Sequence, residues 1–292
     1  MDKYNISKKE SITLYKLMKT IHDIFSKHKV KYWITAGSLL GSVRHGGLIP
    51  WDDDGDICMM IDQVPKLKKL IPIFDRHGYE LNQSTDNDGI KCSDDCDWYV
   101  NKKPDSLGCD IMIMTPDNRK SSLKNNKITK ITYANMYWKN ASNGGQKCSF
   151  DINHVYPLVP IRFGNFFMYG PSNPIEHLNR CYGDNWNSHG MMLYNHRLGK
   201  WMKGTLHPMK THQFHPIPPP KSTAMTKIPP IINTKIPKKL LKITRSRKSR
   251  KTRKTRKSRK TRKTRKTRKS RKTRKTTRRR VKPKRKSRVT KR

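Results

Sequence analysis

Four aspartates stand within five positions of the chain, at Asp52, Asp53, Asp54 and Asp56. Side chains two positions apart on a strand point to the same face, so Asp54 and Asp56 are predicted to project together. Two carboxylates held this close repel each other unless a cation joins them, and hard divalent ions such as Mg²⁺ (or Mn²⁺) take oxygen ligands. Taken alone, the cluster fits a solvated turn equally well, because Asp and Gly both favour turns.

A further carboxylate, Asp110, stands within the otherwise apolar stretch 107-LGCDIMIM. A neighbouring strand can bring it beside Asp54 and Asp56. Two carboxylates from one strand and a third from the next can hold two metals ~4 Å apart, which clamp the attacking and leaving oxygens of phosphoryl transfer. We therefore predict that Asp54, Asp56 and Asp110 are the catalytic and metal-binding residues.

The residues that precede the aspartates favour an anion. Gly37 and Ser38 break a strand just before a helix, and the free backbone N–H groups at a helix N-terminus form an anion site. Arg44 adds a guanidinium fork that suits phosphate, with His45 next to it. A phosphate-binding turn followed by a carboxylate pair is typical of phosphoryl transfer, in which the acids hold the metal and the turn holds the anion.

The string 37-GSLLGSVRHGGLIPWDDDGD-56 resembles the signature of the LicD family, which includes bacterial phosphocholine transferases and the fukutin-related proteins. The stretches 108-GCDIMIM and 171-PSNPIEHLNRCYGDNW resemble later motifs of that family. The resemblance implies a nucleotidyltransferase fold whose metal-binding carboxylates are Asp54, Asp56 and Asp110. It also implies that the substrate side is formed by Gly37, Ser38, Arg44, His45 and Asp52. Gly55 departs from the pattern, because the family usually has an apolar residue there.

The resemblance implies a phosphotransferase for substituted phosphate groups. The donor would be CDP-linked, such as CDP-choline or CDP-ribitol, and the phosphocholine or phospho-polyol group would pass to a glycan hydroxyl with release of CMP. Two alternatives stay open. The first is an NTP-dependent nucleotidyltransferase acting on RNA or a small molecule, and the second is a non-catalytic polyanion-binding or packaging protein.

The elements that must position these residues follow from periodicity. An amphipathic helix is predicted over 7–28, where Ser7 and Glu10 have capping-box spacing. Alternation and turn residues predict strands over 30–37, 54–61 and 107–116, and helices over 38–45, 65–77 and from 173 onward. This order indicates a mixed α/β domain, with a mixed sheet flanked by helices, that covers residues 1–205.

The charge of the chain is concentrated at its C-terminal end. The formal net charge is +45, yet residues 245–292 hold 31 Lys and Arg and no acid, whereas residues 1–184 carry only +4. We predict a Pro-rich linker over 206–244 and a disordered tail over 245–292. The tail is expected to bind nucleic acid or another polyanion non-specifically, with a solubilising tail that has no dedicated partner as the alternative.

Localisation follows from what the sequence lacks. No signal peptide or 18-residue apolar stretch is present, so we expect a cytoplasmic protein without a transmembrane segment, whose tail can direct it to a nucleus, viral factory or virion. The composition also fits an AT-rich genome, such as that of a large DNA virus. We expect the six cysteines to be reduced, with a zinc site on Cys92, Cys96, Cys109 and Cys148 as the alternative.

Overall fold

The computed structural model describes residues 2–84, 94, 96–102, 107–119, 122–124, 127–135, 149–190, 194–195, 200–201, 206–215, 217–220, 227–233, 236 and 241. The chain divides into two units, Met1–Ile243 and Thr244–Arg292. The second unit contains the predicted basic tail and lies outside the described residues. Among the described residues, no helix is both long and apolar enough to cross a membrane.

The first long helix, α1 (Lys8–Lys27), confirms the prediction over 7–28. The hydroxyl oxygen of Ser7 accepts the Glu10 N–H at 3.2 Å, and the Glu10 carboxylate accepts the Ser7 N–H at 2.6 Å, which completes the capping box. The short helix η1 (Asp2–Tyr4) precedes it. The apolar face of α1 is buried and includes Leu14, Leu17, Met18 and Ile21.

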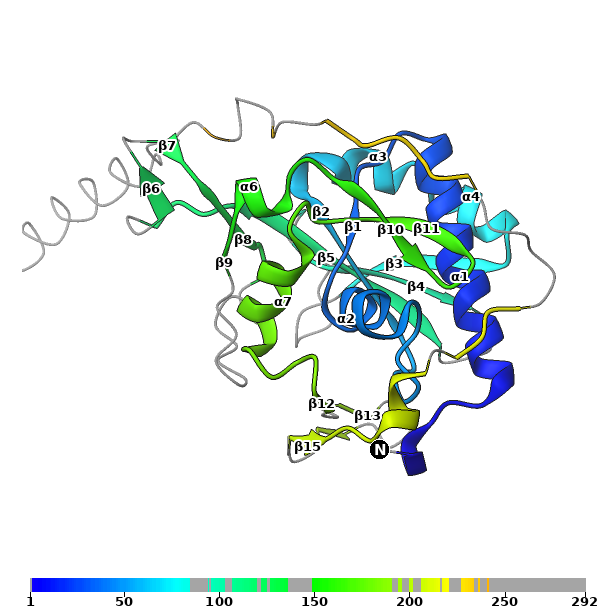
Figure 1. Ribbon diagram of the computed structural model, residues 1–292. Helices are drawn as coiled ribbons and strands as arrows, with labels where there is room; N and C mark the ends of the chain where they lie inside the picture. The colour runs from blue at the N-terminus through cyan, green and yellow to red at the C-terminus, as the bar shows by residue number, and fades with distance from the viewer. Residues whose placement is uncertain are drawn as a thin grey trace, which may run out of the picture. The chain divides into compact units, whose positions relative to one another are not determined.

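Within the described residues the central sheet has seven strands, and Figure 1 shows it running diagonally between the helices. Five strands lie in the order β1-β2-β5-β4-β3, and β8 and β9 extend the sheet from β5. The strand bounds are β1 Trp33–Ile34, β2 Gly55–Met60, β3 Tyr79–Gln83, β4 Trp98–Lys102, β5 Gly108–Pro116, β8 Lys130–Tyr133 and β9 Ser149–Asp151. This confirms the predicted mixed α/β fold, although β1 is much shorter than the predicted strand over 30–37.

The pair β2–β5 forms the middle of the sheet and is the parallel pair among these strands. All six residues of β2 are buried, because a central strand is covered on both faces. The register places Asp56 directly beside Asp110. Residues paired in this way point to the same face of the sheet, so the predicted approach of these two aspartates is confirmed at the level of the backbone.

Helices cover both faces of the sheet. In Figure 1, α2 (Ala36–His45) and α7 (Pro174–Tyr182) lie on one side of the strands, and α3 (Val64–Lys68) and α4 (Ile71–Arg76) on the other. The single helix predicted over 65–77 is therefore wrong, because the helix ends after Lys68 and restarts at Ile71. Pro72 explains the break, since proline has no N–H to donate and its ring disfavours a helix through the preceding residues.

The remaining elements are short. The three-residue 3₁₀ helix η2 (Ile61–Gln63) separates β2 from α3, and α6 (Ile152–Val155) follows β9. The hairpin β10–β11 (Val159–Phe163 and Phe166–Gly170) contacts β1 and α2. The small pairs are β6 Leu123–Lys124 with β7 Lys127–Ile128, β12 His189–Gly190 with β15 His207–Pro208, and β13 Tyr194–Asn195 with β14 Lys200–Trp201.

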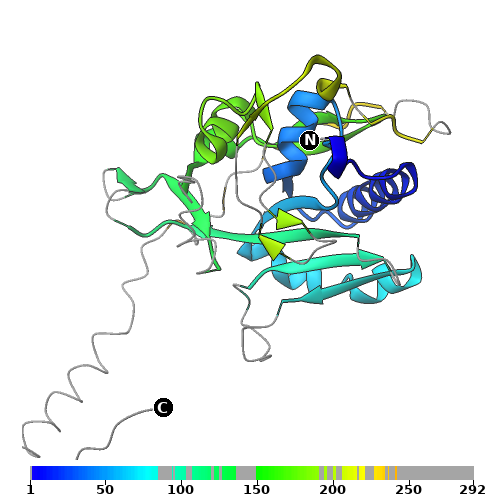
Figure 2. The ribbon, with the colours of Figure 1, turned by 90° about the horizontal axis from the view of Figure 1, so that it is seen from below.

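The described parts of 206–236, which we call the C-terminal segment, contact the domain at several points. They include the helix η6 (Thr211–Phe214), which lies near the N-terminus in Figure 2. The Gln213 amide donates to the Asp2 carboxylate at 3.0 Å, the Tyr15 hydroxyl donates to the Ile217 carbonyl at 2.9 Å, and Ile232 forms a β-bridge with Leu158. The Pro-rich stretch thus packs on the domain. The boundaries predicted at residues 205 and 244 stay a prediction.

The described cysteines differ from one another. Cys58, Cys109 and Cys181 are buried cysteines that are not in a disulfide bond. Cys96 is disulfide-bonded, which differs from the expectation of reduced thiols throughout. Cys92 and Cys148, which the alternative zinc site requires, lie outside the described residues.

Candidate active site

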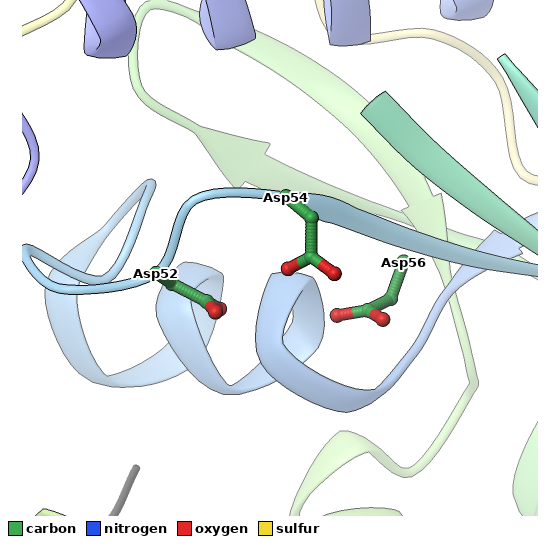
Figure 3. Close-up of side chains that lie close together, drawn as sticks. All are labelled: Asp52, Asp54 and Asp56. Carbon is green, nitrogen blue, oxygen red and sulfur yellow. The ribbon is translucent and has the colours of Figure 1, made fainter. Parts of the chain in front are cut away.

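Three carboxylates converge beside α2, from Asp52, Asp54 and Asp56. Each offers an oxygen, and these oxygens all lie within 4.8 Å of one another. Figure 3 shows the side chains of Asp54 and Asp56 pointing toward the same space, with Asp52 facing them from the preceding loop. Asp56 is buried and the other two are half-buried. We call these three residues the aspartate cluster.

The loop between α2 and β2 brings Asp52 into the cluster. Its backbone is fixed to several parts of the domain, since the Ile6 N–H donates to the Pro50 carbonyl at 2.8 Å and the Asp52 N–H donates to the Ile49 carbonyl at 3.1 Å. Near the end of α2, the Gly47 N–H donates to the Gly41 carbonyl at 3.2 Å, which turns the chain back along the helix. Backbone hydrogen bonds therefore hold the loop that carries Asp52, and Asp52 does not lie on a freely solvated turn.

Asp56 caps the N-terminus of α2. Its carboxylate accepts the Ser38 N–H at 3.2 Å, and the Ser38 hydroxyl oxygen accepts the Asp56 N–H at 2.9 Å. The Gly37 N–H also bonds to this carboxylate. In this structure, the backbone N–H groups that the sequence predicted for a phosphate are bonded to a carboxylate of the protein itself.

The residue at the N-cap position, Thr35, makes no side-chain cap. Its hydroxyl instead lies 3.1 Å from Nε2 of His177, a fully buried side chain that stacks on the ring of Phe150 at 4.2 Å. Burial lowers the pKa of His177 to about 3, so the imidazole is neutral. Sequence reasoning missed this Thr35–His177 contact, because the two residues are 142 positions apart and no local pattern joins them.

Gly37 is required by the close approach of the cluster to α2. A Cβ atom at this position would lie 2.2 Å from Oδ2 of Asp52 and 2.9 Å from Oδ2 of Asp56. Both separations are far below a normal contact, so any larger residue must displace the carboxylates. Ala36, the preceding residue, has a positive φ of 40°, which is a strained conformation for a residue with a side chain.

The electrostatics of the cluster favour a bound cation. Burial, followed by the charges of Asp56 and Asp52, raises the pKa of Asp54 well above its usual range. Burial and the charge of Asp52 likewise raise the pKa of Asp56, to about 8. Negative charges gathered in a partly desolvated place repel each other, and a divalent cation with oxygen ligands relieves that repulsion. The donor set and its burial therefore fit a divalent cation that takes oxygen ligands.

Asp110 lies at the edge of the cluster. It is exposed, and its strand position is directly beside Asp56. Its charge acts on both Asp54 and Asp56, where it contributes to their raised pKa values. Among the described residues, however, the carboxylates that gather within 4.8 Å of one another are those of the aspartate cluster, with Asp52 in the place where the sequence predicted Asp110. Asp52 lies on the loop before β2, where the two-residue alternation of a strand does not apply, so its spacing gave no signal of this approach.

Arg44 and His45 bond to the protein. Nη1 of Arg44 donates to the carbonyls of Trp186 at 2.6 Å and His189 at 2.9 Å. Nε of Arg44 donates to Nε2 of His45 at 2.9 Å. Burial lowers the pKa of Arg44 to about 10, with Tyr182 and Asp52 opposing the shift. The guanidinium thus lies near Asp52, with Nε and Nη1 engaged in contacts within the chain.

The space beside Gly55, the residue that departs from the family pattern, is filled by a side chain from α1. A Cβ atom at Gly55 would lie 2.5 Å from Sδ of Met18 and 3.3 Å from Sγ of Cys109. The Met18 side chain occupies the space that an apolar residue at position 55 would take. The strand that holds Asp56 is therefore packed from α1 despite the missing side chain.

Comparison with known proteins supports the motif. Residues 29–173 match the family model described as LicD/FKTN/FKRP, nucleotidyltransferase domain. An uncharacterized protein of Rickettsia prowazekii is 33% identical over 196 residues, which cover 67% of this chain and 63% of that protein. Human ribitol 5-phosphate transferase FKRP is 27% identical over 149 residues, covering 49% of this chain and 26% of the relative.

A bacterial relative matches a shorter stretch. Lipopolysaccharide cholinephosphotransferase LicD of Haemophilus influenzae is 33% identical over 56 residues, which cover 19% of this chain and 21% of that protein. This chain thus spans less than two thirds of the length of each of these three relatives. The matched region of 29–173 contains α2, the aspartate cluster and Asp110. Through this region the chain belongs to the LicD family of nucleotidyltransferase domains.

Proposed function

We propose that this protein is a metal-dependent transferase that moves a phospho-alcohol group from a CDP-linked donor to a glycan hydroxyl. The observation that carries the proposal is the aspartate cluster at the N-terminus of α2, in a domain of the LicD family. Two relatives are named for the transfer of ribitol 5-phosphate and of a cholinephosphate group, which supports phosphocholine or a phospho-polyol as the transferred group.

In this proposal Asp52, Asp54 and Asp56 hold Mg²⁺ or Mn²⁺ through carboxylate oxygens. When bound, the metal supplies positive charge that offsets the donor diphosphate and the charge developing in the transition state. Asp56 keeps its place through its two hydrogen bonds with Ser38. Gly37 leaves the space in which Asp52 and Asp56 approach the helix.

Asp110 is proposed as the carboxylate on the acceptor side. It is exposed and stands beside Asp56 on the neighbouring strand. A carboxylate in this place can accept the proton of the attacking glycan hydroxyl, or orient that hydroxyl. Most of the rate acceleration would then come from alignment and charge complementarity.

The test is release of CMP from CDP-choline and CDP-ribitol, with Mg²⁺ or Mn²⁺ and candidate glycan acceptors. We expect turnover with one of these donors, its loss with EDTA, and its loss in the Asp54→Asn variant. Asp23→Asn is the matched control, because Asp23 pairs with Lys19 on the exposed face of α1. Turnover of an NTP with neither CDP donor used would favour the nucleotidyltransferase alternative. Binding of polyanions without turnover of any nucleotide would favour the packaging alternative.

A further inference from the structure

Trp51 stands directly before the aspartate cluster and is held by the last two residues of α2. The guanidinium carbon of Arg44 lies 5.8 Å from the centre of the Trp51 ring. The ring of His45 meets the same indole edge-on, with centroids 5.9 Å apart and planes at 87°. Trp51 and His45 are both buried, with 5% and 3% of their surface exposed, so this packing is part of the interior.

Hydrogen bonds fix the two residues that hold the indole. Nε2 of His45 accepts from Nε of Arg44, so the ring hydrogen is on Nδ1, which lies 3.3 Å from the Phe214 carbonyl of the C-terminal segment. Burial and the neighbouring Arg44 lower the pKa of His45 to about 4, which keeps the ring neutral and able to accept. Arg44 in turn binds the carbonyls of Trp186 and His189. The pair thus ties α2 to two segments that come much later in the sequence.

The consequence for the cluster runs through the peptide bond from Trp51 to Asp52. The Asp52 carboxylate lies close to α2, since a Cβ atom built at Gly37 would be 2.2 Å from its Oδ2. Because Trp51 and Asp52 are adjacent in the chain, we expect a change in the position of the indole to move the Asp52 carboxylate relative to Asp54 and Asp56. Groups outside a metal's own ligands that orient those ligands commonly change metal affinity by roughly 10-fold to 100-fold.

We infer that Arg44 and His45 are positioning residues for Asp52, acting through Trp51, rather than ligands of the donor phosphates. This inference rests on the proposed metal site. Arg44 has its Nε and Nη1 engaged within the chain, and His45 presents its acceptor nitrogen to Arg44. Both side chains therefore help to fix the loop that leads from α2 through Trp51 to the aspartate cluster.

The sign of one measurement separates positioning from simple charge. A guanidinium near a cation site repels the cation, so removing it by Arg44→Met should tighten metal binding about twofold to fivefold if Arg44 acts only as a charge. If Arg44 positions Asp52, the same variant should weaken metal binding by roughly 10-fold. Arg44→Lys keeps the charge and loses the planar fork, so positioning again predicts weaker binding whereas charge alone predicts no change.

The experiment measures Mn²⁺ affinity by calorimetry on the full chain without donor, for wild type, Arg44→Met, Arg44→Lys and His45→Phe. His45→Phe changes no charge and keeps a ring against Trp51, but it loses the hydrogen bonds to Arg44 and Phe214. Arg162→Met is the control, since Arg162 lies on β10 and donates to the Gly164 carbonyl. Circular dichroism at the temperature used confirms that each variant is folded.

We expect weaker Mn²⁺ binding in all three variants at positions 44 and 45, and wild-type binding in Arg162→Met. Tighter or unchanged binding in Arg44→Met, or unchanged binding in His45→Phe, overturns the positioning role while leaving the proposed function in place. If Arg44→Met does not fold, His45→Phe and Arg44→Lys decide the question. A wild-type chain that binds no Mn²⁺ overturns the metal site of the proposed function, and this inference with it.

Discussion

Replacing Asp56 should separate its two roles, because the residue is at once a helix cap and a member of a repelling cluster. The carboxylate accepts the Ser38 N–H and receives further contact from the Gly37 N–H, in the place that the Thr35 hydroxyl leaves empty. It also lies beside the charges of Asp52 and Asp110, which together with burial raise its pKa to about 8. The cap stabilises the fold, whereas the repulsion destabilises it.

The sign of the repulsion follows from linkage. A carboxyl group whose folded pKa is above its unfolded value of about 4 is most favourable to folding at low pH, and that contribution is lost as pH rises from about 4 to about 8. Asp56→Asn removes the titrating group but keeps an oxygen that can accept the Ser38 N–H. Without metal at pH 7.5, we expect its free energy of unfolding to exceed that of wild type by about 1–3 kcal/mol.

Asp56→Ala removes the repulsion and the cap together. Loss of a helix N-cap costs about 1 kcal/mol, so Asp56→Ala should be less stable than Asp56→Asn by that amount. Both variants should lose the rise in melting temperature that Mg²⁺ or Mn²⁺ gives to wild type, because a ligand that binds the folded state stabilises it.

The assay is urea unfolding followed by circular dichroism in EDTA, with the slope of the transition compared among the three proteins. Equal free energies of unfolding for Asp56→Asn and Asp56→Ala would refute the capping role of Asp56. An Asp56→Asn variant less stable than wild type in EDTA would refute the repulsion. Asp23→Asn serves again as the control, since Asp23 forms an exposed pair with Lys19.

Three further predictions follow from other contacts. The folded pKa of buried His177 is about 3, so the unfolded chain takes up a proton first as pH falls below about 6.5, and the free energy of unfolding then falls by up to about 1.4 kcal/mol per pH unit. In urea unfolding at pH 7 and pH 5, His177→Gln should lose this part of the pH dependence. An unchanged pH dependence would show that His177 is not its cause. Gly37→Ala should weaken Mn²⁺ binding by at least roughly 10-fold in calorimetry, because the new Cβ atom displaces the movable carboxylates of Asp52 and Asp56. The melting temperature in EDTA should change little. Wild-type Mn²⁺ affinity in this variant would contradict the close approach of these carboxylates to position 37. Deletion of 245–292 should leave turnover of a small acceptor unchanged. Deletion of 206–292, by contrast, should lower the melting temperature, because it removes the residues that contact Tyr15, His45 and Leu158. Equal melting temperatures for the two truncated proteins would mean that the C-terminal segment contributes no stability.

Much of the fold was predictable because its signals are local. The capping box at Ser7 and Glu10, the periodicity of α1 and the apolar run of β5 each lie within a short stretch. The approach of Asp110 to the pair of Asp54 and Asp56 on a neighbouring strand was also anticipated, whereas the register that places it beside Asp56 comes from the structure. The break before Ile71 was not predicted, although Pro72 was visible, because the helical pattern continued across it.

The parts of the site that sequence reasoning assigned differently depend on long-range packing. Asp52 joins the cluster because the loop after α2 returns along the helix and Trp51 packs on Arg44 and His45. The partners of Arg44 are carbonyls of residues 186 and 189, which no motif connects to position 44. A motif gives residue types and spacing, but it does not give the direction in which a long side chain such as arginine turns.

The two groups that the sequence offered for a phosphate are both engaged within the chain. The N-terminus of α2 binds the Asp56 carboxylate, and Arg44 donates to backbone carbonyls. A donor diphosphate that approaches the proposed site therefore meets the charges of Asp52, Asp54, Asp56 and Asp110, and Coulomb repulsion disfavours its binding. In the proposed mechanism the divalent cation must supply the charge complementarity that neither the helix nor the arginine provides. CDP binding in calorimetry should accordingly vanish in EDTA, whereas affinity that came from the helix N-terminus or Arg44 would persist without metal.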